Sequence, residues 1–75
     1  MIKEYYKQLI VDTGIEMLRT GITVGTWGNI SARDPETGLI YISPSGMEYE
    51  KIGTRHVVVI SLELKTIDGQ AEPSI

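Results

Sequence analysis

The apolar residues in positions 2–20 recur every three or four residues, which is the spacing of one face of an α-helix. This stripe consists of Ile2, Tyr6, Leu9, Ile10, Thr13, Met17 and Leu18. Gly21 follows directly, and glycine readily takes the left-handed conformation that ends many helices. We therefore predict a helix that ends at Gly21. A helix of this length is marginal alone in water, so its apolar face must pack on another element.

Gly14 lies inside the predicted helix. A glycine in a helix interior costs about 1 kcal/mol relative to alanine. Two explanations remain open: another element approaches the helix closely at this residue, or the helix is simply not optimised.

From Asn29 onward the apolar residues alternate with a period of two, which is typical of strands. Asn29–Arg33 is predicted to be a short, half-buried strand. Asp34–Gly38 has turn chemistry throughout and predicts a hairpin loop of about five residues. Leu39–Ser43 follows with apolar residues on both faces, so we expect an interior strand that ends at Pro44.

The second half of the chain begins with a predicted helical insert. Met47–Ile52 has the length of one or two helical turns, with Ile52 and either Met47 or Tyr49 on the core, and Gly53 ends it.

Val57–Ile60 is a run of β-branched apolar residues and is expected in the middle of a sheet. Residues 62–65 continue the strand-like alternation, and Asp68–Gly69 predicts a turn. One helix followed by three or four strands predicts an α/β fold with mixed α+β layers. A sheet of this kind leaves an edge or a face open, so we expect that the chain oligomerises or belongs to something longer.

Size and charge exclude several classes of protein. With 75 residues the chain forms at most one small domain, and the net charge of −3 with scattered basic residues argues against nucleic-acid binding. No apolar run approaches the length of a membrane helix. There is no cysteine and only one histidine, His56, so the chain lacks a zinc site of the usual type. We expect a soluble, cytoplasmic protein in which His56 is an ordinary surface or edge residue.

Two polar turns, Gly25–Ser31 and Ser43–Gly46, bracket the predicted hairpin. Their glycines let a ligand approach the backbone, and Thr26 and Asn29 offer short donors to an anion. The sequence contains neither a Walker A loop nor a Gly-x-Gly-x-x-Gly fingerprint. On composition alone the plain turn is the favoured interpretation of both segments.

The order of the motifs is more informative than either turn. The chain contains, in this order, Thr-x-Gly-Asn-x-Ser at 26–31, a predicted hairpin, Ser-Pro-Ser-Gly at 43–46, a β-branched strand and Glu-Pro-Ser at 72–74. This series of motifs resembles the class II aldolase/adducin family. Within that family the likeness is greatest to members that split L-fuculose 1-phosphate. The resemblance implies that residues 1–75 are the N-terminal portion of a single, truncated class II aldolase-like domain, with the N-terminal helix packed on a mostly antiparallel sheet.

The resemblance also implies a function for the turns, because in the family they bind the phosphate of a sugar phosphate. The corresponding residues of this chain are Thr26, Asn29, Ser45, Gly46 and Ser74. Ile75 departs from the family pattern, since a second serine is expected there.

In the family, a glutamate moves the proton and three histidines hold Zn²⁺, and none of these residues is present in this chain. Aldol cleavage of a ketose 1-phosphate to dihydroxyacetone phosphate and an aldehyde needs both groups. We therefore expect the 75 residues alone to bind the phosphorylated sugar but to be inactive and to bind no Zn²⁺. The full-length family members are homotetramers.

Three alternatives stay open. A pentose-phosphate 4-epimerase and a methylthioribulose-phosphate dehydratase share the phosphate turns, and an adducin-like protein keeps the fold for interaction without catalysis. Intact Thr26, Asn29, Ser45 and Gly46 argue against the adducin-like alternative.

Overall fold

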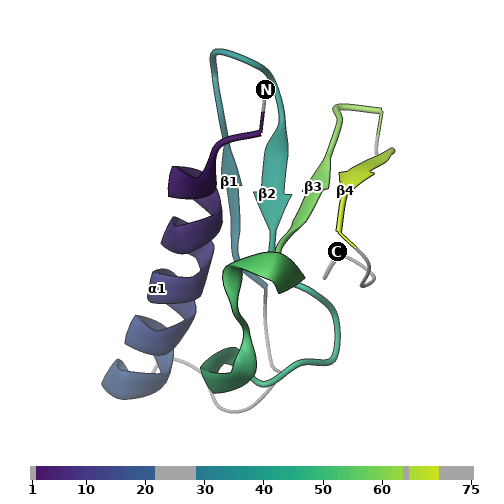
Figure 1. Ribbon diagram of the computed structural model, residues 1–75. Helices are drawn as coiled ribbons and strands as arrows, with labels where there is room; N and C mark the ends of the chain where they lie inside the picture. Colours follow the sequence, from purple (N-terminus) through teal and green to yellow (C-terminus); the bar gives the residue numbers. More distant parts are fainter. Residues whose placement is uncertain (1, 22–28, 64, 70–75) are drawn as a thin grey trace.

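The protein folds as one long helix beside a four-stranded sheet (Figure 1). The structure, a computed structural model, describes residues 2–21, 29–63 and 65–69. The elements are α1 (Glu4–Thr20), β1 (Ser31–Arg33), β2 (Ile40–Ile42), β3 (Val58–Ile60) and β4 (Thr66–Asp68). Each strand pairs antiparallel with the next, in the order in which they occur in the chain. The predicted α/β class, with an N-terminal helix packed on an antiparallel sheet, is confirmed.

Helix α1 ends as predicted, and most of its predicted apolar stripe packs on the core: Ile10 is buried, and Tyr6, Met17 and Leu18 pack against the core partly buried. Gly21 has a φ of 79°, and its N–H donates to the carbonyl oxygen of Leu18 at 3.2 Å. Ile2 and Leu9, which the apolar stripe placed against the core, are each 38% exposed. The buried residues of the helix are Lys7, Ile10 and Gly14, of which Ile10 belongs to the stripe.

Lys7 is buried in the helix although it is charged. Its side chain is mostly buried, and its Nζ lies 2.6 Å from the Oδ2 atom of Asp68 on β4. A lysine can bury its aliphatic stem while its ammonium group keeps a charged partner. The hydrogen bond with Lys7 is the main reason why the pKa of Asp68 lies below its ordinary value.

Gly14 is the point of closest approach between α1 and the helical insert. A Cβ atom placed on Gly14 would lie 3.2 Å from Cβ of Tyr49 and 3.5 Å from Cδ1 of Ile30. These distances leave little room for a side chain. Of the two explanations for this glycine, the structure supports the close approach.

The core has two parts because successive residues of a strand point to opposite faces of the sheet. Between the sheet and α1 lie Ile10, Ile30, Tyr41, Tyr49, Ile52, Val57 and Val59. On the other face lie Ile42, Val58 and Ile60. Both β2 and β3 are interior strands with two apolar faces, as their sequences predicted.

The helical insert is confirmed, but it is formed by 3₁₀ turns. These are η1 (Tyr49–Lys51) and η2 (Thr54–His56). Tyr49 and Ile52 are buried on the core, whereas Met47 is only partly buried. Both turns contact α1, and η1 does so beside Gly14.

The region after β3 corrects the sequence prediction. Residues 62, 63 and 65 lie outside any strand, and the Ser61 N–H donates to the carbonyl oxygen of Lys65 at 2.9 Å. Leu62 is exposed in this turn. Asp68, predicted to lie in a turn, is the last residue of β4.

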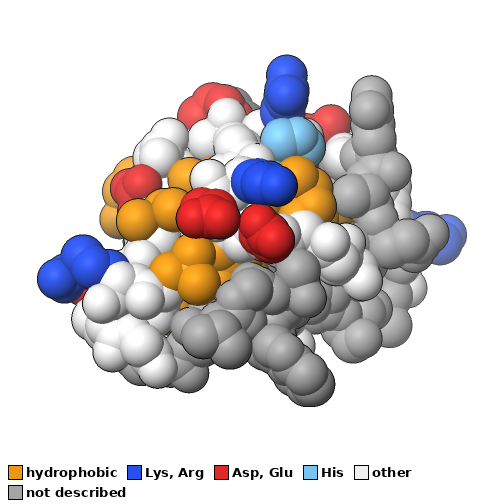
Figure 2. Space-filling view, turned by 90° about the horizontal axis from the view of Figure 1, so that it is seen from below, with side chains coloured by type: hydrophobic (Ala, Val, Ile, Leu, Met, Phe, Trp, Pro, Cys, Tyr) orange, Lys and Arg blue, Asp and Glu red, His pale blue; other side chains and the backbone are white. Residues whose placement is uncertain are grey.

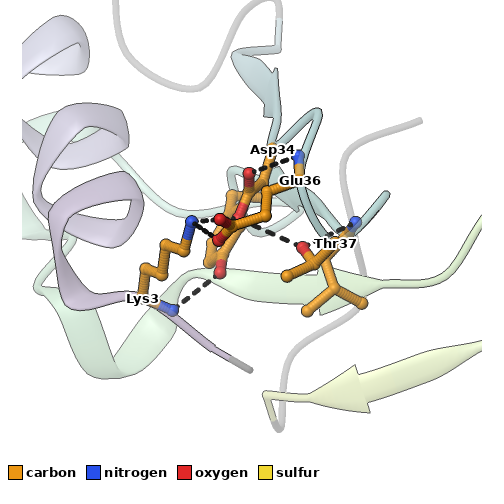
Figure 3. Close-up of polar contacts among 6 residues, drawn as sticks. Lys3, Asp34, Glu36 and Thr37 are labelled. Carbon is orange, nitrogen blue, oxygen red and sulfur yellow. Dashed lines mark hydrogen bonds and ion pairs between the residues drawn. The ribbon is translucent and has the colours of Figure 1, made fainter.

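The start of α1 is tied to the β1–β2 loop by Lys3 (Figure 3). The Lys3 backbone N–H donates to the Tyr41 hydroxyl at 2.8 Å, and its Nζ lies 3.0 Å from Asp34 Oδ2 and 2.6 Å from Glu36 Oε1. The hydrogen bond with Glu36 is the main cause of the raised pKa of Lys3. The Tyr6 ring stacks on Tyr41 with ring centroids 5.1 Å apart. The helix and the hairpin are therefore fixed to each other at this end.

Asp34 organises the hairpin loop. It is 1% exposed, its Oδ1 accepts from the Glu36 N–H at 2.9 Å, and its Oδ2 accepts from the Thr37 hydroxyl at 3.1 Å. Burial raises the pKa of Asp34. The hydrogen bonds from Lys3, Glu36 and Thr37 together outweigh burial and hold the pKa below its ordinary value.

Replacing Gly14 with leucine should destabilise the protein by about 1–3 kcal/mol, because the added side chain overpacks the contact with Tyr49 and Ile30. Urea unfolding measures this change. Ile15→Leu is the matched control, since Ile15 is exposed on the same helix and a change there should stay within about 0.5 kcal/mol. Equal stability of the two variants would contradict the close approach.

Replacing Asp34 with asparagine should lower the thermal unfolding midpoint at pH 7. The midpoint of the variant should also decrease less than that of the parent when the pH is lowered. Because the folded-state pKa is lowered, the stabilisation is complete above the ordinary value of about 3.9 and disappears as the pH falls through the folded value. Melting curves from pH 7 to pH 2 measure this. Glu63→Gln, at an exposed residue, serves as control. A pH profile of Asp34→Asn identical to the parent's would refute the role of this carboxylate.

Candidate functional site

The structure describes three of the five predicted phosphate-binding residues: Asn29, Ser45 and Gly46. Thr26 and Ser74 lie outside the described residues. Strand β1 runs from Asn29 toward the Asp34–Gly38 loop, and β2 runs back toward Ser45. Asn29 and the Ser45–Gly46 turn therefore lie at the same end of the hairpin, opposite the loop (Figure 1).

A pair of hydrogen bonds joins these two segments. The Ser43 N–H donates to the carbonyl oxygen of Ile30 at 2.9 Å, and the Ile30 N–H donates to the Ser43 hydroxyl oxygen at 3.1 Å. The pair continues the β1–β2 register, in which Ser31 lies opposite Ile42. Asn29 directly precedes Ile30, and Ser45 follows Ser43 by two residues. The relative position of the two segments is thus set by the Ile30–Ser43 pair.

Sequence reasoning gave Ser43 no role of its own, although it placed the residue at the end of a strand and at the start of the Ser43–Gly46 turn. Ser43 is fully buried, and its side chain is hydrogen-bonded to Tyr49. Burial raises the pKa of the Tyr49 hydroxyl, and the hydrogen bond with Ser43 opposes that rise. The sequence did contain a signal for this role: Ser43 is a hydroxyl residue between an apolar strand and Pro44, where the hydrogen bonds between strand backbones end.

The Ser45–Gly46 turn is exposed. Gly46 has a φ of 76°, in the left-handed region that favours glycine, and no atom lies within 4 Å of a Cβ placed on it. The glycine is therefore needed for its backbone conformation and not to relieve crowding. The same open space leaves the turn accessible to a ligand.

This end of the molecule does not present a uniformly basic surface. Figure 2, which views the molecule from the end where η1 and η2 lie, shows acidic and basic side chains side by side among the described residues. Close to the turn, Lys51 Nζ lies 3.6 Å from Glu48 Oε2, so each partly neutralises the other. An anion bound here would depend mainly on neutral hydrogen-bond donors.

The part of the chain that the structure describes does not fit a metal ion. Within it, no three histidine, cysteine, aspartate or glutamate side chains come together. His56 is partly exposed and its Nδ1 accepts from the Gly53 N–H at 2.9 Å, which closes η2. This local role agrees with the prediction of an ordinary histidine. We therefore derive no catalytic step through a metal from these residues.

The described helix is too short and too polar to cross a membrane.

Residues 8–75 match the family described as Class II Aldolase and Adducin N-terminal domain. The chain belongs to this family. The resemblance carried by the motifs is thereby confirmed.

Relatives within the family have different activities. The chain is 40% identical over 68 residues to L-ribulose-5-phosphate 4-epimerase UlaF of Salmonella typhi, covering 91% of this chain and 30% of the relative. It is 40% identical over 74 residues to 5-deoxy-D-ribulose 1-phosphate aldolase of Bacillus thuringiensis serovar kurstaki, covering 99% and 35%. The chain thus spans about a third of the length of these relatives.

A solved structure shows the same fold. The structure of an L-fuculose 1-phosphate aldolase superposes with a TM-score of 0.93 at 32% sequence identity, covering 99% of this chain and 35% of that one. The predicted likeness to members that act on L-fuculose 1-phosphate is confirmed at the level of fold and sequence. Family membership does not assign the individual site residues, so the roles of Asn29, Ser45 and Gly46 stay predictions.

Replacing Gly46 with alanine should destabilise the protein by roughly 1–2 kcal/mol, because a side chain is strained at positive φ. Gly46→Asn should cost less, since asparagine tolerates the left-handed conformation better. Urea unfolding of the two variants measures the difference. If alanine and asparagine cost the same, the conformational requirement at Gly46 is wrong.

Proposed function

We propose that this chain forms the phosphate anchor of a sugar-phosphate aldolase. The enzyme would cleave a ketose 1-phosphate, similar to L-fuculose 1-phosphate, into dihydroxyacetone phosphate and an aldehyde. The observation that carries the proposal is the Ile30–Ser43 pair, which holds Asn29 and the Ser45–Gly46 turn at one end of the hairpin. Membership of the class II aldolase and adducin family supports it.

The proposed donors are the Asn29 side-chain amide, the Ser45 hydroxyl and the Gly46 backbone N–H. Thr26 and Ser74 complete the set by resemblance to the family. All five donors are neutral, which suits an end of the molecule where acidic and basic side chains are mixed. Short side chains on an ordered hairpin lose less conformational entropy on binding than lysines would. The phosphate would thereby fix the substrate relative to the sheet and orient its carbon chain.

Binding and orientation are the roles that we assign to this chain. The resemblance implies that the whole enzyme also contains Zn²⁺, which when bound would stabilise the enediolate formed in aldol cleavage. By the same resemblance we infer a cytoplasmic homotetramer. The described residues offer no metal cluster, so none of their roles passes through the metal.

A 4-epimerase acting on L-ribulose 5-phosphate is the second candidate. The Salmonella typhi epimerase is as similar in sequence, at 40% identity, as the Bacillus thuringiensis aldolase. The same phosphate anchor suits both reactions, because an anchor contacts the phosphate and leaves the reacting carbons to other groups.

Replacing Asn29 or Ser45 with alanine in the complete enzyme should raise the KM for its sugar phosphate about tenfold, which corresponds to about 1.4 kcal/mol of lost binding. The kcat should change less, because an anchor binds substrate and transition state alike. Initial-rate kinetics measure both constants. Thr66→Ala is the control, since Thr66 is an exposed residue of β4, outside both polar turns. An unchanged KM in both anchor variants would refute the proposal.

The same assay separates the candidates when the parent enzyme is offered L-fuculose 1-phosphate, 5-deoxy-D-ribulose 1-phosphate and L-ribulose 5-phosphate. Release of dihydroxyacetone phosphate is expected from a ketose 1-phosphate. Inversion at C4 without cleavage would favour the epimerase. If the parent binds no phosphate at all, an adducin-like interaction protein is the better explanation.

A further inference from the structure

Two hydroxyl groups are buried beneath the proposed phosphate anchor. Ser43 is 0% exposed and Tyr49 is 2% exposed, and their side chains share a hydrogen bond. Burying a hydroxyl is unfavourable unless it is hydrogen-bonded. The described residues contain no buried side-chain nitrogen or oxygen without a partner. The pair is therefore a satisfied polar cluster inside an otherwise apolar core.

The hydrogen bonds of Ser43 give it a specific task. A serine hydroxyl has one proton to donate and two lone pairs that accept. The Ser43 oxygen accepts from the Ile30 N–H at 3.1 Å, so its proton remains available for the hydrogen bond with Tyr49. The Ser43 backbone N–H also donates to Ile30, at 2.9 Å. One residue thus holds both polar backbone groups of Ile30.

Tyr49 is itself held in place by the helix. Its Cβ and Cγ atoms lie 3.2 and 3.3 Å from the position that a Cβ of Gly14 would occupy. The tyrosine therefore connects α1 to Ser43, and Ser43 connects to the backbone beside Asn29.

We propose that Ser43 is a positioning residue, which with Tyr49 sets the separation between Asn29 and the Ser45–Gly46 turn. The inference rests on the proposed phosphate anchor. Ser43 is fully buried, so it acts through the backbone of Ile30 and does not touch the phosphate. Without its hydroxyl, one of the two hydrogen bonds between Ser43 and Ile30 is lost, although the proposed donors on Asn29, Ser45 and Gly46 are unchanged.

Ser43→Ala in the complete enzyme tests this role with inorganic phosphate as the probe. We expect the Kd for phosphate, measured by calorimetry, and the KM for the sugar phosphate to rise about tenfold, with kcat changed less. Amide hydrogen exchange at Ile30 should become faster, since its N–H loses its acceptor. Ser43→Thr keeps the hydroxyl and should restore both readouts toward the parent values.

Two further variants separate positioning from general loss of stability. Tyr49→Phe removes only the hydroxyl and should weaken phosphate binding about threefold, less than Ser43→Ala. Ile60→Val removes one methylene from the opposite face of the sheet and should leave phosphate binding unchanged. If Ser43→Ala fails to fold, Tyr49→Phe decides: weakened binding supports the inference, and unchanged binding overturns it.

The remaining outcomes distinguish this inference from the proposed function. If Asn29→Ala weakens phosphate binding but Ser43→Ala does not, the positioning role is overturned and the anchor stands. If neither variant weakens binding, both are overturned. If Ile60→Val weakens binding as much as Ser43→Ala, ordinary packing explains the effect and the positioning role is wrong.

Discussion

The packing of Tyr49 against Gly14 is the contact on which the rest of the structure depends. The absence of a side chain at Gly14 lets η1 approach α1, and this approach buries Tyr49 in the core. Its hydroxyl then meets Ser43, and Ser43 holds the backbone of Ile30. Helix, insert and hairpin are thereby connected through one side chain. The glycine costs helical propensity, but it permits a contact that no larger residue would allow.

The two ends of the β1–β2 hairpin are stabilised in different ways. At the loop end, Lys3 and Asp34 supply charges, and the hydrogen bonds of Asp34 hold its loop closed. At the other end, the buried hydroxyl of Ser43 accepts from the Ile30 N–H beside the exposed Asn29. This division suits the proposed function, because a phosphate anchor needs donors that are not already neutralised by ion pairs. Mechanical support and the proposed ligand binding are thus placed at opposite ends of the same hairpin.

The shared anchor explains why similarity alone leaves the reaction open. An aldolase and an epimerase both hold the phosphate of their substrate, and relatives of both kinds are equally identical to this chain. Interactions with a group that does not react stabilise substrate and transition state alike. The choice between breaking a carbon–carbon bond and inverting a centre depends on groups near the reacting carbons. The residues of the proposed anchor therefore indicate the class of substrate more than the type of reaction.

The sequence by itself determined the features that depend on neighbouring residues: the helix end at Gly21, the Asp34 turn, the two interior strands and the family motifs. Only the tertiary structure decided that Lys7 is buried in α1, because its partner is Asp68, 61 residues away. It also decided the strand formed by Thr66–Asp68 and the role of Ser43, which depend on pairing across the sheet and on burial beside Tyr49. Local patterns specify periodicity and turns, whereas contacts between distant residues select among the arrangements that those patterns allow.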